Sequence, residues 1–176
     1  ADAFAWAVAN EARGLTDGNT LIALQNGGGI REDLDNDENG IITQGEAQAT
    51  LPFTNTMAVI QNVDPAGLAL VLENAVAALP HQSGSFGHVS GIKFDYNPNA
   101  AVGNRIIEIR RADGTVVWHK GTGAQLAGNF DIATNSFLAS AGTPDGYDFN
   151  AYGKAILSTG YADALIGFLT TKLGGA

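Results

Sequence analysis

An acidic stretch early in the chain has the residue spacing of a calcium-binding loop. Residues 35–46 match the EF-hand loop pattern, in which spaced Asp and Asn residues precede a glycine and a final glutamate. Such loops hold calcium through oxygen atoms alone, from side chains, from one main-chain carbonyl and from the closing carboxylate. The sequence therefore predicts a structural calcium site, which would fix the loop after Arg31, with ligands from Asp35, Asp37, Asn39, the carbonyl of Ile41, and Glu46.

The same residues have a second explanation that needs no metal. Thr43 followed three residues later by Glu46 is the sequence of a capping box at a helix start. An EF-hand also has a helix before its loop, and here the glycines 27–29 lie just upstream. Calcium binding and simple helix capping both remain open at this point.

A second candidate is the glycine-rich run Asn26-Gly27-Gly28-Gly29-Ile30-Arg31. Glycine lets the backbone approach a ligand closely, and the arginine guanidinium suits phosphate or hydroxyl oxygens. Taken alone, the run is explained better by a tight turn that needs small residues than by a ligand site.

Hydrophobic periodicity and turn residues predict mixed helices and strands in one domain spanning residues 1–176. Thr43 and Asp64 are expected N-caps, and Asp113-Gly114 is expected to turn a β-hairpin. Helices are predicted at 2–12, 44–51, 65–79 and 161–173, and strands at 20–25, 54–61, 92–96, 107–110, 116–118 and 132–140. This order favours an α+β fold over a strictly alternating α/β sheet.

Composition excludes several classes of protein. The net charge of −9 disfavours binding to a nucleic acid polymer, and the absence of cysteine excludes disulfides and thiolate chemistry. No apolar run approaches the roughly 20 residues that span a bilayer. The first residues do not form a signal peptide, and they begin inside a helical pattern, which predicts a domain taken from a longer protein.

Three groups of residues, in this order, carry a resemblance to a known family. The first is the run 26–31 together with Leu51-Pro52-Phe53, and the second is the segment 84–92, Gly-Ser-Phe-Gly-His-Val-Ser-Gly-Ile. The third is the segment 135–139, Asn-Ser-Phe-Leu-Ala, which closes with Asp145-Gly146-Tyr147. Over nearly its whole length the chain resembles the C-terminal domain of the 5′-nucleotidase family, which includes UDP-sugar hydrolases and 2′,3′-cyclic nucleotide phosphodiesterases.

The resemblance implies a layered α/β/β/α domain that binds the nucleoside or nucleotide substrate. Phe86 and Phe137 would sandwich the base, Asp145 would accept from the ribose hydroxyls, and Arg31 would contact phosphate or ribose. The full set of substrate-binding residues that it implies is Asn26, Gly28, Gly29, Arg31, Phe86, Phe137, Asp145 and Tyr147. These residue types suit the task, because aromatic faces stack any base and a carboxylate suits a cis-diol.

The chain also departs from the family pattern. The turn 140–144 before Asp145 is longer than usual, and the family's upstream arginines precede the first residue of this chain. With only His81, His88 and His119, the sequence lacks the clustered Asp, His and Asn ligands of a dinuclear metal centre. The resemblance places that centre, with its catalytic His-Asp pair, in an N-terminal metallophosphoesterase domain, so this chain alone is predicted to be inactive.

The resulting hypothesis is a substrate-recognition domain of a periplasmic or extracellular bacterial hydrolase, with no catalytic residues of its own. One alternative keeps the fold without the ligand, as a calcium-stabilised structural module of a large exported protein. A second alternative, a phosphatase that uses the calcium loop, is disfavoured because one oxygen-only loop provides no dinuclear geometry.

Overall fold

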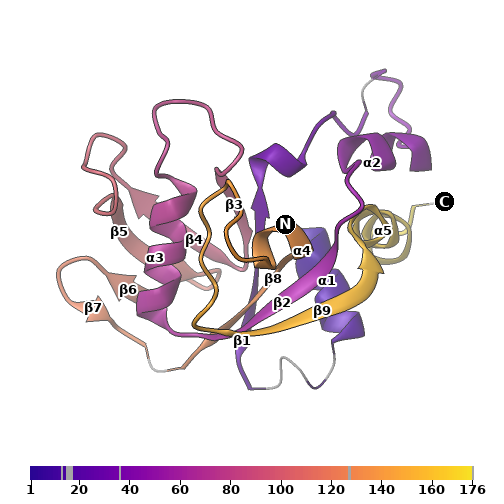
Figure 1. Cartoon of the computed structure of the whole chain (residues 1–176). Coiled ribbons are helices and arrows are strands. Elements are labelled where there is room, and N and C mark those ends of the chain that lie inside the picture. Colours follow the sequence, from indigo (N-terminus) through magenta and orange to yellow (C-terminus); the bar gives the residue numbers. More distant parts are fainter. Residues whose placement is uncertain (13, 15–17, 36, 127, 176) are drawn as a thin grey trace.

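The computed structural model describes residues 1–12, 14, 18–35, 37–126 and 128–175. Two β-sheets form its framework (Figure 1). The five-stranded sheet has the order β3 (Gly87–Ser90), β1 (Thr20–Asn26), β8 (Phe130–Asn135), β2 (Thr56–Val63) and β9 (Gly153–Gly160). The four-stranded sheet has the order β4 (Ile92–Tyr96), β5 (Ile106–Arg111), β6 (Val116–His119) and β7 (Gly123–Ala124).

Helices pack against these sheets and connect them. They are α1 (Asp2–Glu11), α2 (Gln44–Thr50), α3 (Pro65–Ala75), α4 (Ser136–Ala139) and α5 (Tyr161–Gly167), with a 3-10 turn η1 at Gly27–Gly29 and a π-helical turn η2 at Phe168–Lys172. Among the described residues, no helix is long and apolar enough to cross a bilayer.

The central strands are buried on both faces and separate two cores. Ile22 and Leu24 of β1 point into one core with α3 and the four-stranded sheet, whereas Ala23 between them points into the other. That second core lies between the sheet and the helices α1 and α5. Since successive side chains of a strand face opposite sides, buried strands read as continuous apolar runs, as 20–25 does. The structure confirms the expected α+β class with two sheets and layered helices.

The predicted helix starts are confirmed in detail. The Thr43 side chain accepts from the Glu46 backbone N–H, and the Glu46 carboxylate accepts from the Thr43 N–H, which completes the capping box. Asp64 caps α3, but that helix ends at Ala75 and not at residue 79. The Arg105 guanidinium donates to the carbonyls of Val76 and Ala77, which satisfies the helix end at this earlier position.

The predicted strand 132–140 is wrong in its second half. The strand β8 ends at Asn135, whose side-chain oxygen accepts from the Leu138 N–H at 2.9 Å and begins α4. Phe137 therefore lies on a short helix. The strands β3 and β9 are not predicted from the sequence, because β3 is only four residues long and β9 has three consecutive apolar residues, 155–157, in place of an apolar–polar alternation.

The parallel pairing of β1 with β8 positions the site. These two central strands run side by side in the same direction, with Ala23 opposite Ala133. Their carboxyl ends, at Asn26 and Asn135, therefore lie at the same edge of the sheet. The glycine-rich run follows one end and the helix of Phe137 follows the other, so the topology brings together residues more than a hundred positions apart.

Candidate ligand-binding site

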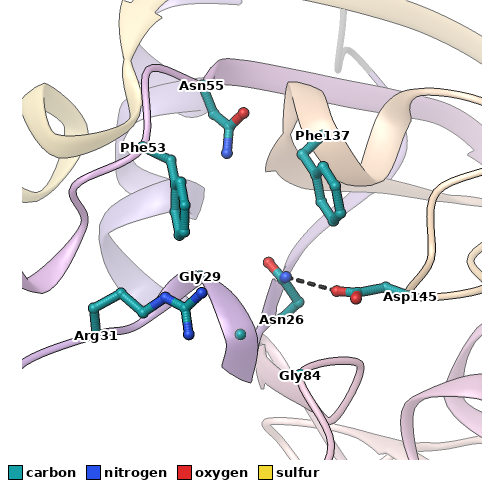
Figure 2. A pocket seen from close by; sticks show the side chains of 9 residues that line it. Asn26, Gly29, Arg31, Phe53, Asn55, Gly84, Phe137 and Asp145 are labelled. Carbon is teal, nitrogen blue, oxygen red and sulfur yellow. Dashed lines mark hydrogen bonds between the residues drawn. The ribbon is translucent and has the colours of Figure 1, made fainter.

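A cavity of about 400 Å³ opens at this edge of the sheet (Figure 2). Its wall comes from four separate parts of the chain: the glycine-rich run, the segment before β2, the loop before β3, and the region from α4 onward. The lining residues are Asn26, Gly28, Gly29, Arg31, Phe53, Asn55, Gly84, Phe137 and Asp145. The volume lies in the range of ordinary small-molecule sites.

Two phenylalanine rings, Phe53 and Phe137, stand on opposite sides of the cavity (Figure 2). Phe53 is 43% exposed, so its ring is accessible to a ligand. The guanidinium carbon of Arg31 lies 5.2 Å from the centroid of the Phe53 ring, within cation–π range. The Asn55 amide reaches toward the space between the rings (Figure 2). The arrangement can accept a flat aromatic group with a polar edge.

A polar group lies below the rings. The Asn26 amide nitrogen donates to Asp145 Oδ2 at 2.7 Å, which joins the end of β1 to the loop after α4. Asn26 is 4% exposed, and its amide oxygen accepts from the buried Asn135 amide at 3.1 Å. The Asp145 carboxylate therefore sits at the cavity wall with its orientation held by a buried amide.

Backbone hydrogen bonds join the glycine-rich run to the loop before β3, where Gly28 and Gly84 line the cavity. The Gly28 N–H donates to the Gly84 carbonyl at 2.9 Å, and the Gly27 N–H donates to the Phe86 carbonyl at 2.8 Å. A Cβ on Gly28 would lie 2.9 Å from Gly84 Cα, so the two loops approach this closely only because both carry glycine.

Most of the predicted substrate-binding residues do meet in one place. Asn26, Gly28, Gly29, Arg31, Phe137 and Asp145 all line the cavity. Sequence reasoning missed Asn55, Gly84 and, above all, Phe53. The signal for Phe53 was present, since the ring follows a proline just before a strand, in a segment that already carried the family resemblance.

Phe86 and Tyr147 are not placed in this cavity. Phe86 is half-buried against the core and meets His88 edge to face at 5.5 Å, and its main-chain carbonyl supports the glycine-rich run. Tyr147 is buried, stacks on Phe149 at 6.0 Å and donates to the Ser85 carbonyl at 2.7 Å. Burial also raises the pKa of the Tyr147 phenol. The Tyr147 side chain therefore supports the loop 83–86 from behind, and Phe86 does not face Phe137 across the cavity.

The acidic loop brings three carboxylates together. Oxygen atoms of Asp35, Asp37 and Glu46 lie within 4.8 Å of one another, on a turn in which Gly40 has a φ of +79°. The carboxylates also accept local hydrogen bonds: Asp35 accepts from the Gly40 N–H, and Glu46 accepts from Thr43. The amide oxygen of Asn39 accepts from the Ile41 N–H at 2.7 Å. This oxygen-only donor set fits the preference of calcium, although no α-helix precedes the loop among the described residues after β1.

Comparison with known proteins settles the family. Residues 1–152 match the family model described as the C-terminal domain of 5′-nucleotidase. The chain belongs to this family. It is 32% identical over 146 residues to the trifunctional nucleotide phosphoesterase protein YfkN of Bacillus subtilis, and 30% identical over 146 residues to the 5′-nucleotidase of Diplobatis ommata.

These relatives are much longer than this 5′-nucleotidase C-terminal domain. The matches cover 81% of this chain, but only 9% of YfkN and 24% of the Diplobatis protein. Among solved structures, the 5′-nucleotidase precursor of Thermus thermophilus superposes over 99% of this chain and 32% of its own length, with a TM-score of 0.79 and 26% identity. The chain is therefore similar to one part of larger proteins.

Proposed function

We propose that this domain binds the nucleoside part of the substrate of a 5′-nucleotidase-type phosphoester hydrolase. The observation that carries the proposal is the pair of rings, Phe53 and Phe137, that face each other across a cavity with a polar wall. Stacking on aromatic side chains is worth about 1–3 kcal/mol per base, with little dependence on which base it is.

The remaining wall residues suit the rest of such a ligand. The Asp145 carboxylate suits the ribose hydroxyls as an acceptor, and the Asn55 amide offers both a donor and an acceptor to the base edge. Arg31, at the cavity mouth beside Phe53, would contact phosphate through its fork of N–H donors. In this proposal Phe53 takes the role that the sequence analysis gave to Phe86.

The chemical step belongs to another part of the protein in this proposal. The relatives named as nucleotidases and phosphoesterases extend far beyond the region matched here. An N-terminal metallophosphoesterase domain would supply two metal ions, which would activate the attacking water and stabilise the charge on the phosphoryl group as the nucleoside oxygen leaves. The present residues would hold the nucleoside so that its phosphate reaches that centre.

A snake venom 5′-nucleotidase of Naja atra, 31% identical over 127 residues, supports a periplasmic or extracellular location.

The decisive experiment is calorimetric titration of adenosine into the 176-residue chain and three single variants. Phe53→Ala and Phe137→Ala each remove one ring, so each is expected to weaken binding by about tenfold or more. Phe86→Ala is the matched control, since it removes a half-buried ring outside the cavity and should leave the affinity within about threefold. Absence of saturable binding at millimolar adenosine would contradict the proposal. If Phe86→Ala lost binding and Phe53→Ala did not, the ring opposite Phe137 would be Phe86, as the family resemblance implies.

For the acidic loop we propose a structural calcium ion held by Asp35, Asp37 and Glu46, with oxygens from Asn39 and Ile41. The closeness of the three carboxylates supports it, because an ion would relieve their mutual repulsion. Excess calcium should raise the melting temperature relative to a chelator, and Asp37→Asn should abolish the rise. Glu38→Gln, on an exposed loop residue outside the cluster, is the control and should behave as the parent chain. If calcium did not change the melting temperature, the calcium proposal would be wrong, and the role of the loop would be limited to the capping box of α2.

If calcium stabilises the chain and adenosine does not bind, the structural-module alternative is the correct one. The two measurements therefore separate the two hypotheses without reference to the rest of the protein.

A further inference from the structure

Asn135 is completely buried at the end of β8 and uses both ends of its amide. Its oxygen accepts from the Leu138 N–H at 2.9 Å and begins the helix that carries Phe137. Its nitrogen donates to the Asn26 amide oxygen at 3.1 Å and to the Gln25 amide oxygen at 3.3 Å. The Asn135 side chain thus contacts both α4, the helix that carries Phe137, and Asn26, the residue that holds Asp145.

This arrangement fixes which way the Asn26 amide points. A backbone N–H can only donate, so the Leu138 contact requires that the Asn135 oxygen faces the helix and that its nitrogen faces Asn26. The Asn26 oxygen must then face Asn135, which leaves its nitrogen to donate to Asp145 Oδ2 at 2.7 Å. The reverse orientation would place the Asn26 oxygen against a carboxylate and an N–H against an N–H.

The neighbouring side chains of Gln25 and Tyr161 favour the same orientation of the amides. The Gln25 nitrogen donates to the Tyr161 hydroxyl at 2.5 Å and to the Asn26 main-chain carbonyl at 2.8 Å, and it lies 3.4 Å from the Asn26 amide oxygen. The Gln25 amide therefore keeps its oxygen toward the Asn135 nitrogen, which agrees with the orientation of Asn135. Gln25 is 2% exposed and Tyr161 is 1% exposed, so water does not compete for these contacts. Buried amides with a single compatible arrangement are rigid, because every alternative leaves a donor or an acceptor unpaired.

We infer that Asn135 is a positioning residue that sets the direction of the Asn26 amide and thereby orients the Asp145 carboxylate toward the sugar of the ligand. The inference rests on the proposed function, since it assumes a nucleoside in the cavity. Asn26 occupies Asp145 Oδ2 and so leaves Oδ1 as the acceptor for a ribose hydroxyl. Discrimination between a ribose and a sugar without hydroxyls is then controlled from a residue that never touches the ligand.

The test compares adenosine with 2′,3′-dideoxyadenosine, which keeps the base and lacks both hydroxyls. The parent chain should bind adenosine at least about tenfold more tightly than dideoxyadenosine, because only adenosine can donate a hydrogen bond to the charged carboxylate. In Asn135→Ser the serine still caps α4, but no amide orients Asn26. The affinity ratio of the two ligands should fall to about one, while the affinity for dideoxyadenosine changes by less than about threefold, since the stacking rings are untouched.

The control is Thr134→Val, which alters the preceding buried residue of β8, on the opposite face of the sheet. It should keep the full affinity ratio. Should Asn135→Ser fail to fold, Asn135→Asp keeps the shape and the cap but replaces the donor by an acceptor. That change draws the Asn26 nitrogen away from Asp145, and the affinity ratio should again collapse.

The outcomes are distinguishable. If the parent chain binds neither ligand, the proposed function is wrong and the inference falls with it. If the parent chain discriminates and the Asn135 variants discriminate equally well, the inference alone is overturned. If the Asn135 variants lost affinity for both ligands by the same factor, the inference would also be overturned, because Asn135 would then have only a structural role.

Discussion

At the scale of single residues, Gly29 shows how tightly the polar groups behind the cavity are packed. A Cβ at this position would lie 2.1 Å from the Tyr161 hydroxyl and 2.5 Å from the Gln25 amide nitrogen. Burial raises the pKa of Tyr161 to about 12, despite the opposing Gln25 hydrogen bond and the charge of Arg31, so the phenol is neutral at physiological pH. An added methyl group must therefore displace a neutral, hydrogen-bonded hydroxyl.

We expect Gly29→Ala to lower the free energy of unfolding by about 1–3 kcal/mol, as overpacked core substitutions do. Chemical denaturation measures the change. Tyr161→Phe in the same chain removes the clashing oxygen and should recover part of the loss.

The matched control is Gly45→Ala in α2, where a Cβ meets nothing closer than the Thr43 hydroxyl at 3.8 Å. Replacing a helical glycine should raise stability by about 0.5–1 kcal/mol. Similar changes in stability at both glycines would show that the contacts around Gly29 do not matter.

The candidate site is largely visible in the sequence, except for its second ring. Residue type points to the run with Asn26 and Arg31, the family resemblance implies Phe137 and Asp145 as well, and the structure brings all four to one cavity. The resemblance implies Phe86 as the second ring, and the polar glycine-rich loop around Phe86 favours an exposed ring over a core one. Which of the two rings faces the cavity depends on which side of each loop packs on the core, and the position of Phe53 in the Leu51-Pro52-Phe53 segment is a weaker signal than the packing itself.

At the scale of elements, the end of α1 holds the edge strand β9. The Glu11 carboxylate accepts from the N–H groups and the hydroxyls of Ser158 and Thr159. Burial alone would raise the pKa of Glu11, but these donors hold it below its usual value of 4.5. The ionised form is therefore the one that ties the helix to the strand.

We expect Glu11→Gln to lower stability at neutral pH by about 1 kcal/mol, a small value because the carboxylate is exposed. A lowered pKa in the folded state contributes stability above pH 4.5, and this contribution is lost as the pH falls through the folded value. The difference between parent and variant should thus shrink below pH 4.5, as followed by urea denaturation. Glu32→Gln, in the exposed loop after Arg31, should show no such convergence.

Elements with strong local signals are predicted well from the sequence, and those set by tertiary contacts are not. The capping box at Thr43 and the cap at Asp64 are encoded within a few residues, and both form. The switch from β8 to α4 depends on the capping oxygen of Asn135, and the apolar pattern around that residue is equally typical of a continuing strand. β9 is a strand because β2 offers it a partner, and its own sequence alternates only weakly.

At the scale of the whole molecule, this chain recognises a ligand in our proposal but does not transform it. We expect the purified 176-residue chain to release no phosphate from adenosine monophosphate or p-nitrophenyl phosphate, with manganese or zinc added. The chain has three histidines and none of the clustered ligand motifs that a dinuclear centre requires. Metal-dependent turnover that follows the protein through two different columns would contradict this expectation.

The backbone hydrogen bonds beside the cavity have a consequence for protein engineering. The hydrogen bonds Gly27–Phe86 and Gly28–Gly84 are made by backbone atoms, so they do not depend on the side chains at Phe53, Asn55 and Phe137. The rings of Phe53 and Phe137 and the amide of Asn55 line the same cavity as Gly28 and Gly84. A library randomised at those three positions should therefore yield binders with altered base preference on an unchanged scaffold, which makes this domain a starting point for selective nucleoside sensors.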